Sequence, residues 1–415
     1  MDIFDKIYKK QGPIGMHAGF AHNYFTFPKL EGEISNRMIF RGKEKIIWSL
    51  NNYLGLANHP EVRKTDADAA KLYGLARPMG ARMMSGNSDL HEKLENELSK
   101  FVGKEDTFLL NYGYQGVISL IDALLDRHDI LVYDAESHAC IIDGARLHLG
   151  KRFAFTHNNI ENLEKQLQHA TKLLGPEGSI LVITEGVFGM SGDQGKLKEI
   201  VALKSKYSFR LLIDDAHGFG VMGPQGQGTH FEQGVPDGVD VYFATFAKAM
   251  ASIGAFVSSK KEIILYLRYE MRSQTFAKAM PLPFVVGNLK RLELIQEHPE
   301  FKQKLMTIVN AMQKGLKERG LDIGRTNTCV TPVYLKGTTQ EAANLIMDLR
   351  ENYGVFCSMV IYPVIPKGEI LIRIVPSANN TLEDVEITLN AFTEIAKKLK
   401  NKEYDSQNVI IPKSF

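Results

Sequence analysis

The stretch LLIDDAHG at residues 211–218 is followed by YFATFAK at residues 242–248, about one βα unit further along the chain. Each stretch begins as a short apolar run, which is typical of a strand buried on both faces of a parallel sheet. In such sheets ligands bind at the carboxyl ends of the strands. An acid and a histidine after one strand and a lysine after the next predict a site for pyridoxal phosphate (PLP). The lysine would form the Schiff base, and the acid would lie against the pyridine nitrogen. The pattern therefore predicts an α/β enzyme.

The composition excludes several classes of protein. The 415-residue chain has 50 Lys and Arg against 48 Asp and Glu, for a formal charge of +2, so it implies no basic face for nucleic acid. Its cysteines, Cys140, Cys329 and Cys357, lie far apart, which argues against a disulfide framework or a metal site. Residues 1–6 lack the features of a signal peptide, and no run of about eighteen apolar residues follows. We therefore expect a soluble, cytoplasmic protein without a transmembrane segment.

The order of helical and strand patterns predicts two domains. We expect a large α/β domain with a mainly parallel central sheet and helices on both faces, followed by a smaller C-terminal α+β domain. The expected division is an N-terminal segment at residues 1–59, a PLP-binding domain at 60–290, the small domain at 291–400 and a polar tail at 401–415. Helices are expected at 61–72, 89–101, 117–125, 196–207, 260–272, 301–319, 340–353 and 382–399, and strands at 107–110, 130–133, 179–184, 209–214, 329–335, 355–362 and 369–374.

The hexapeptide TFAKAM occurs twice, at residues 245–250 and 275–280, so two lysines compete for the Schiff base. Lys248 follows a strand and precedes the small residues 251–255, where backbone can approach a cofactor closely. Lys278 follows a charged helical stretch and runs into prolines. Lys248 is therefore the predicted Schiff-base lysine.

Three further features fit a site at the same edge of the sheet. The turn NYGYQG at residues 111–116 follows a strand and opens a helix, so its backbone N–H groups form a natural phosphate site. His138 follows the next strand-like run and could stack on a planar ring, although a lone histidine is more often structural. Arg373 lies within an apolar strand. Its guanidinium needs a partner there, either a substrate carboxylate or an internal salt bridge.

Several ordered motifs resemble those of the α-oxoamine synthases, a family of fold-type I PLP enzymes. They span nearly the whole chain: NNYLGLANHP at 51–60, GYQ at 113–115, SHA at 137–139 with IDG at 142–144, DDAHG at 214–218 and TFAK at 245–248. The family includes 2-amino-3-ketobutyrate CoA ligase, 8-amino-7-oxononanoate synthase, 5-aminolevulinate synthase and serine palmitoyltransferase. The resemblance implies a homodimer with the active site between subunits. It also implies condensation of an amino acid with an acyl thioester and loss of carbon dioxide.

The resemblance also implies roles for individual residues. The predicted catalytic residues are Lys248 as the Schiff-base lysine, Asp214 on the pyridine nitrogen, His217 near the ring oxygen and His138 stacked over the ring. The further residues expected to hold the cofactor are Gly113, Tyr114, Thr245 and Thr275, and those expected to face the amino-acid carboxylate are Asn52 and Arg373.

The chain departs from the family pattern within the expected pocket. Gly189, Ala247 and Ala277 stand where relatives usually carry serine, so several hydrogen bonds to the cofactor are in doubt. The pocket has lost hydroxyl groups.

The same region gains cations. Lys278 stands where small residues are usual, and the loop at residues 73–82 is one residue longer than the usual version. That loop contains Arg77 and Arg82, which we count with Lys278 as candidate substrate contacts. A sulfonate near Lys278 or Arg77 would account for an otherwise costly buried charge. The alternative is that these side chains contact the phosphate of an acyl carrier, or solvent.

The loss of hydroxyl groups and the gain of cations together favour a substrate more anionic than glycine or alanine. The predicted reaction is the decarboxylative condensation of cysteate or serine with a long-chain acyl thioester, giving the 3-keto base of a sulfonolipid or sphingolipid. CoA or an acyl carrier protein could present the acyl group, and the slightly basic charge suits either. The alternatives are a 2-amino-3-ketobutyrate CoA ligase, an 8-amino-7-oxononanoate synthase, an aminotransferase and a non-catalytic subunit. The presence of Lys248, Asp214 and His217 argues against the last.

Overall fold

In a computed structural model of the chain, residues 2–9, 15, 18–362 and 364–405 are described. The chain forms two compact units. The large unit comprises Asn51–Leu305 with Asn327–Cys329, and the small unit comprises Met1–Leu50, Met306–Thr326 and Val330–Phe415. The first fifty residues thus group with the C-terminal part of the chain. The predicted domain boundaries after residues 59, 290 and 400 stay predictions.

The large unit is built on a seven-stranded sheet with the order β4-β10-β9-β8-β7-β5-β6. The strands from β6 to β9 in this order are parallel to their neighbours, and β10 runs antiparallel to both β9 and β4. The predicted mainly parallel sheet is therefore confirmed. The strands are β4 (Asp106–Leu110), β5 (Ile130–Asp134), β6 (Lys151–Phe155), β7 (Ile180–Glu185), β8 (Arg210–Asp214), β9 (Val241–Thr245) and β10 (Ala255–Ser259).

The two central strands come from the apolar runs expected at residues 179–184 and 209–214. Every residue of β7 is buried, as is all of β8 after Arg210, because helices cover a parallel sheet on both faces. The crossover helix expected at 196–207 is shorter than predicted. It ends as α9 at Ala202 and continues as a 3-10 turn over Leu203–Ser205.

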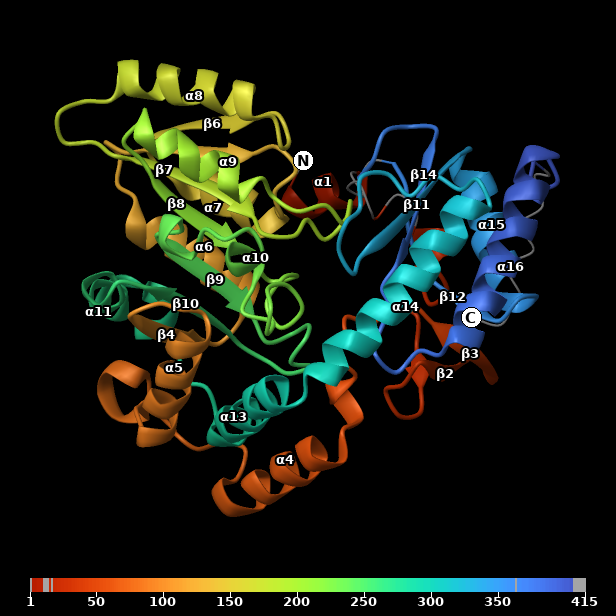
Figure 1. The fold of residues 1–415 in the computed structure, drawn as a ribbon, viewed down its shortest axis with the longest axis horizontal. Coiled ribbons are helices and arrows are strands. Elements are labelled where there is room, and N and C mark those ends of the chain that lie inside the picture. Colours follow the sequence, from red (N-terminus) through yellow and green to blue (C-terminus); the bar gives the residue numbers. More distant parts are fainter. Residues whose placement is uncertain (1, 10–14, 16–17, 363, 406–415) are drawn as a thin grey trace. The chain divides into compact units, whose positions relative to one another are not determined.

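Helices pack on both faces of this sheet (Figure 1). On one face, α6, α7 and α11 enclose an apolar core that includes Val117, Ile141, Leu212 and Leu267. The helices of the large unit are α4 (Pro60–Tyr73), α5 (Asp89–Phe101), α6 (Gly113–Leu124), α7 (Ala139–Leu147), α8 (Ile160–Leu173), α9 (Leu197–Ala202), α10 (Thr229–Glu232), α11 (Lys261–Glu270), α12 (Arg272–Thr275) and α13 (Leu282–Glu297). The boundary between the units falls inside α14 (Pro299–Glu318).

The small unit combines two short sheets with helices, as the predicted α+β pattern requires. One sheet has the order β1-β2-β3-β12 and the other β11-β14-β13. The strand expected at residues 355–362 is instead two strands in different sheets. The elements are β1 (Leu30–Glu31), β2 (Arg37–Phe40), β3 (Lys43–Ile47), β11 (Thr331–Lys336), β12 (Val355–Phe356), β13 (Ser358–Val360), β14 (Glu369–Ile374), α1 (Ile3–Lys9), α3 (Ala18–Ala21), α15 (Thr339–Glu351) and α16 (Leu382–Lys400). Among the described residues, none of the helices has the length and apolar character needed to cross a membrane.

Candidate active site

Three strand ends place polar side chains on one face of the large sheet. Side chains alternate between the two faces along a strand. Ile183, Leu212 and Phe243 belong to the apolar core that the sheet forms with α6 and α7. The same face therefore receives the residues two positions further along each strand, which are Glu185, Asp214 and Thr245.

The turn between β4 and α6 presents the start of a helix to this face. Tyr112 is the N-cap residue, and its side chain makes no capping hydrogen bond, so the first N–H groups can bind an anion. A Cβ atom on Gly113 would lie 3.2 Å from Thr245 Oγ1. Glycine thus lets the helix end approach the end of β9. The structure brings Gly113 and Thr245, both predicted phosphate ligands, together, and Tyr114 lies in the first turn of the same helix.

Asp214 is a buried carboxylate at the end of β8. Its Oδ1 accepts the N–H of Ala216 at 3.0 Å, and its Oδ2 lies 3.9 Å from the thiol of Cys140, a weak donor. Burial raises the pKa of Asp214, and the positive charge of Lys248 counteracts part of that rise. A further cation against the carboxylate would lower this pKa again. The position therefore suits a protonated ring nitrogen.

Lys248 lies in a tight turn after β9. Its carbonyl oxygen accepts the N–H of Ala251 at 2.9 Å, and its side chain is half-buried. The positive charge of Lys248 opposes the effect of burial on the pKa values of Glu185 and Cys140 as well as of Asp214. The lysine thus acts electrostatically on the same strand ends that carry the acids.

His138 is the N-cap residue of α7. Its Nδ1 accepts the N–H of Cys140 at 3.3 Å and lies 2.9 Å from the Cys140 sulfur. Its own N–H donates to Glu185 Oε1 at 2.5 Å. The ring packs edge-on against Tyr114, with 5.9 Å between the ring centroids. The predicted stacking histidine is therefore held through both its backbone and its ring, next to the phosphate turn.

His217 and Gly189 occupy adjoining space. His217 Nδ1 lies 2.6 Å from the hydroxyl of Tyr53, and both side chains are buried. A Cβ atom on Gly189 would lie 2.2 Å from His217 Nε2. The loss of a side chain at Gly189 therefore leaves room for the imidazole in this position. Asn52, beside Tyr53, is buried, and its Oδ1 accepts the N–H of Ala57 at 3.2 Å.

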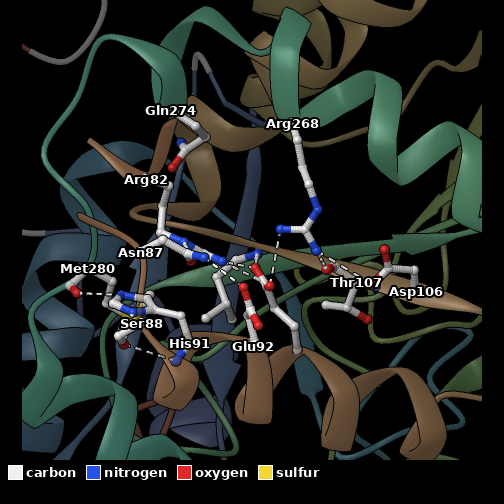
Figure 2. A network of polar contacts seen from close by, with 12 residues as sticks. Arg82, Asn87, Ser88, His91, Glu92, Asp106, Thr107, Arg268, Gln274 and Met280 are labelled. Atoms are coloured by element: carbon white, nitrogen blue, oxygen red, sulfur yellow. Dashed lines mark hydrogen bonds and ion pairs between the residues drawn. The ribbon is translucent and has the colours of Figure 1, made fainter. Parts of the chain in front are cut away.

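Arg82 takes part in a buried ion-pair network, which favours a structural role over the predicted substrate contact (Figure 2). Its guanidinium donates to Glu95 Oε1 at 2.8 Å and Oε2 at 3.0 Å, and its Nε donates to Asn87 at 2.6 Å. Glu95 also accepts hydrogen bonds from Arg268 at 3.1 Å and from the N–H of Leu109 at 2.9 Å. All three guanidinium nitrogens of Arg82 are thus engaged within the protein. These bonds hold the loop of Arg82 against α5, and a contact of Arg82 with substrate stays a prediction.

The second TFAKAM copy forms a segment bound through its main chain. The N–H of Ala279 donates to Gly80 O at 2.9 Å, and Asn111 Nδ2 donates to Lys278 O at 2.7 Å. The Lys278 side chain is exposed. Thr275 ends α12, and its hydroxyl donates to Met271 O at 3.2 Å. The backbone is fixed next to the phosphate turn, while the substrate and cofactor roles of Lys278 and Thr275 stay predictions.

The two remaining predicted cations lie in different units. Arg77 is an exposed residue of the large unit, and its guanidinium lies 5.6 Å from the ring centroid of Tyr73. Arg373 lies on β14 of the small unit, where it is partly buried and pairs in register with Pro332 and Ser358. Their contacts with substrate stay predictions.

The structure adds three residues to the site that no sequence pattern had indicated, Glu185, Cys140 and Tyr53. Glu185 ends an apolar strand just as Asp214 does. An acid at the carboxyl end of a buried strand is the signal that indicated Asp214, and it applies equally to Glu185. The predicted strand stopped at residue 184, one residue before Glu185. Within the described part of the chain, no group of three or more His, Cys, Asp or Glu side chains is placed to hold a metal ion.

Comparison with known proteins gives consistent matches over the chain. The family model "Aminotransferase class I and II" matches residues 43–392. A cysteate-C-fatty acyltransferase from Capnocytophaga ochracea is 58% identical over 415 residues, which are 100% of this chain and 99% of the relative. A serine palmitoyltransferase from Bacteriovorax stolpii is 35% identical over 376 residues, 91% of this chain and 88% of the relative. Among solved structures, serine palmitoyltransferase from S. paucimobilis with a bound PLP–myriocin aldimine has a TM-score of 0.88 and 27% identity. It covers 97% of this chain and 100% of that one. The predicted fold-type I architecture is confirmed.

Proposed function

This chain belongs to the α-oxoamine synthase branch of the class I and II aminotransferase family, and from that premise we propose that it condenses cysteate with a long-chain acyl thioester and releases carbon dioxide. The observation that carries the proposal is the 58% identity to a cysteate-C-fatty acyltransferase over the whole chain. Identity to a serine palmitoyltransferase is 35%. The product would be the 3-keto base of a sulfonolipid.

The site fits PLP, which when bound supplies an electron sink for the negative charge that develops at the α-carbon of the amino acid. Asp214 would bind the protonated ring nitrogen, since it is a buried carboxylate with only one strong hydrogen bond among the described residues. The N–H groups at the start of α6, with Gly113 and Thr245 in close contact, would hold the phosphate. The cradle and the acid lie on one sheet face.

Three side chains would act on the bound amino acid and the ring. Lys248 lies near the strand ends that carry the acids, as its effect on their pKa values shows, and in its neutral amine form its Nζ would accept the proton that leaves the α-carbon. His138 would lie over the ring from the start of α7. His217, held by Tyr53, would donate to the ring oxygen.

The sulfonate sets the substrate apart from serine. A sulfonate is anionic at every working pH, so a pocket that selects it needs a fixed cation. We assign this role to Lys278, with Arg77 as the second candidate, and the amino-acid carboxylate to Asn52 and Arg373. A homodimer with an active site shared between subunits, presentation of the acyl group by CoA or a carrier protein, and a cytoplasmic location belong to the same proposal.

The test of the function is a titration of the purified PLP-loaded protein with cysteate, serine, glycine and alanine. We expect a saturable change in visible absorbance at the lowest concentration for cysteate. Addition of a long-chain acyl-CoA should then release free thiol. Saturation by serine first would indicate sphingoid-base synthesis, and saturation by glycine first a ketobutyrate ligase. Amino-group transfer without thiol release would indicate an aminotransferase.

The sulfonate contact is tested separately by Lys278→Ala. Loss of one charge-assisted hydrogen bond costs about 1.5–3 kcal/mol, so the KM for cysteate should rise roughly tenfold or more. The KM for serine should change little. Lys172→Ala removes an exposed lysine of α8 and is the matched control. Equal effects of Lys278→Ala on the KM for both substrates would show that Lys278 does not bind the sulfonate.

A further inference from the structure

Two carboxyl groups lie side by side in the site. Glu185 ends β7, Asp214 ends the neighbouring parallel strand β8, and the two are partners in the strand register. Residues paired in this way project from the same face of a sheet. Both are 5% exposed. The arrangement places a second buried acid next to the one expected to bind the ring nitrogen.

Glu185 also holds the backbone of a second site residue. Its Oε1 accepts the N–H of His138 at 2.5 Å. His138 is the N-cap of α7, with its ring against Tyr114 in the first turn of α6. A short bond from a buried side chain to a helix cap fixes the entry of the chain into the helix. The ring position of His138 therefore depends on Glu185.

The charges around the pair leave one of the acids neutral. Two adjacent carboxylates in a buried site cannot both ionise without a large cost. Burial and the charge of Asp214 raise the pKa of Glu185 well above the usual range, and the nearby charge of Asp134 adds to the rise. Lys248 and the N–H of His138 act in the opposite direction.

Different neighbouring groups oppose the rise in pKa that burial causes in Glu185 and in Asp214. For Asp214 the charge of Lys248 is the largest opposing effect, followed by the N–H of Ala216, the charge of His138 and the thiol of Cys140. The thiol itself stays protonated, because burial raises its pKa. The proton of the pair therefore resides on Glu185.

We propose that Glu185 is a positioning residue of this active site: its neutral carboxyl fixes the start of α7 under His138 and leaves Asp214 as the single carboxylate that can bind a protonated ring nitrogen. The proposal deepens the proposed function and rests on it, because it presupposes a cofactor ring between His138 and Asp214.

Two substitutions separate this role from that of an ionised acid. Glu185→Gln keeps the acceptor oxygen and is neutral at all pH values, so the dissociation constant for PLP, measured by absorbance or fluorescence, should stay within about threefold of the native value. Glu185→Leu is also neutral but loses the bond to His138. It should weaken PLP binding roughly tenfold or more. Equal losses in both variants would overturn the proposal, because they would show that the negative charge is required.

A second readout uses the apoprotein and needs no activity. An acid whose pKa is raised by folding contributes stability that is present below its unfolded pKa and is lost as the pH rises through the folded value. The ordinary pKa of glutamate is about 4.3. As the pH is raised from about 5 to about 8, the unfolding temperature of the native protein should therefore fall relative to that of Glu185→Gln. A difference that is constant with pH would overturn the neutral state of Glu185.

A control variant makes this comparison specific. Glu341→Gln alters a buried carboxylate that caps α15 in the small unit, and it reports the general effect of replacing a buried glutamate. Because the apoprotein measurement does not involve substrate, it stands even if the enzyme proves to use an amino acid other than cysteate. Failure of the inference and failure of the proposed function are thus distinguishable.

Discussion

Lys248 and Lys278 lie in identical hexapeptides but in different surroundings. Lys248 is half-buried in the turn after β9, and its charge acts on Asp214 and Glu185. Lys278 has an exposed side chain, and its carbonyl oxygen is bound by Asn111. The same six residues thus present one lysine to the strand ends and the other to solvent.

We therefore expect borohydride reduction of the PLP-loaded protein to attach the cofactor to Lys248. Peptide mass spectrometry distinguishes the two copies by their flanking residues. Lys248→Ala should abolish the attachment, and Lys278→Ala should leave it intact. Label on the peptide that contains Lys278 would contradict the assignment.

Gly189 is a second position at which a single side chain decides the site. We expect Gly189→Ser to displace the His217 ring, since its Cβ would lie 2.2 Å from Nε2, and to lower the unfolding free energy by about 1–3 kcal/mol, as overpacking does. The matched control is Gly175→Ser, because a Cβ at that exposed glycine meets nothing within 4 Å. Denaturant unfolding curves compare the two. Equal unfolding free energies of the two variants would contradict the prediction, because they would show that the His217 ring can move to another rotamer without loss of stability.

At the scale of elements, the loop between β7 and α9 is anchored by a charged histidine. His157 Nδ1 lies 2.9 Å from Asp134 at the end of β5, and Nε2 lies 3.0 Å from Asp193 in the loop. Burial alone lowers the pKa of His157, but hydrogen bonds to Asp134 and Asp193 raise it to about 9. The loop that carries Gly189 is therefore held to β5 by an imidazolium between two carboxylates.

This ion-pair cluster predicts a pH dependence of stability. The pKa of His157 rises from 6.5 in the unfolded chain to about 9 in the folded one. Its stabilisation is therefore complete below pH 6.5 and is lost as the pH rises through about 9. A shift of this size corresponds to at most about 3–4 kcal/mol. His157→Gln should remove this contribution. Unfolding curves measured below 6.5 and above 9 test it, with exposed His169→Gln as control. A native-to-variant difference that does not shrink at high pH would refute the charged state.

At the scale of the whole molecule, ligand binding couples to the stability of the chain. The acid, the lysine and the phosphate turn come from different strand ends of the large unit, so the unfolded chain cannot hold the cofactor in the same way. Binding to the folded state alone adds about 2.7 kcal/mol when the ligand is at 100 times its dissociation constant.

Removal of PLP should therefore lower the unfolding temperature by about 1–2 °C for each kcal/mol lost. Differential scanning fluorimetry with and without PLP measures the shift, and pyridoxal without the phosphate is the control for the turn at Gly113. Thr245 Oγ1 donates to Gly254 O at 2.9 Å and accepts the N–H of Ala247 at 3.2 Å, so Thr245→Val should lower the unfolding temperature of the apoprotein. We expect it to reduce the PLP-dependent shift as well, and the shift is measured against the apoprotein of the same variant. No PLP-dependent shift in the native protein would contradict the site.

The sequence by itself determined five of the seven strands of the large sheet and the edge at which the site lies, whereas β6 and the antiparallel β10 were not predicted. Local periodicity is enough for this, because an apolar run followed by Asp214 or by the turn with Lys248 already marks a strand and its carboxyl end. Thr381 is the N-cap residue of α16, and its Oγ1 accepts the N–H of Asp384 at 3.1 Å, a contact between residues only three positions apart.

Contacts between residues far apart in the chain were decided only by the tertiary structure. The register of β7 against β8 placed Glu185 beside Asp214, loop packing placed Gly189 against His217, and the fold placed Arg82 against Glu95. None of these pairings has a local signature, since each depends on strand register or side-chain packing, which are properties of the folded chain as a whole. Local pattern marked where the site lies, and packing decided which side chains meet there.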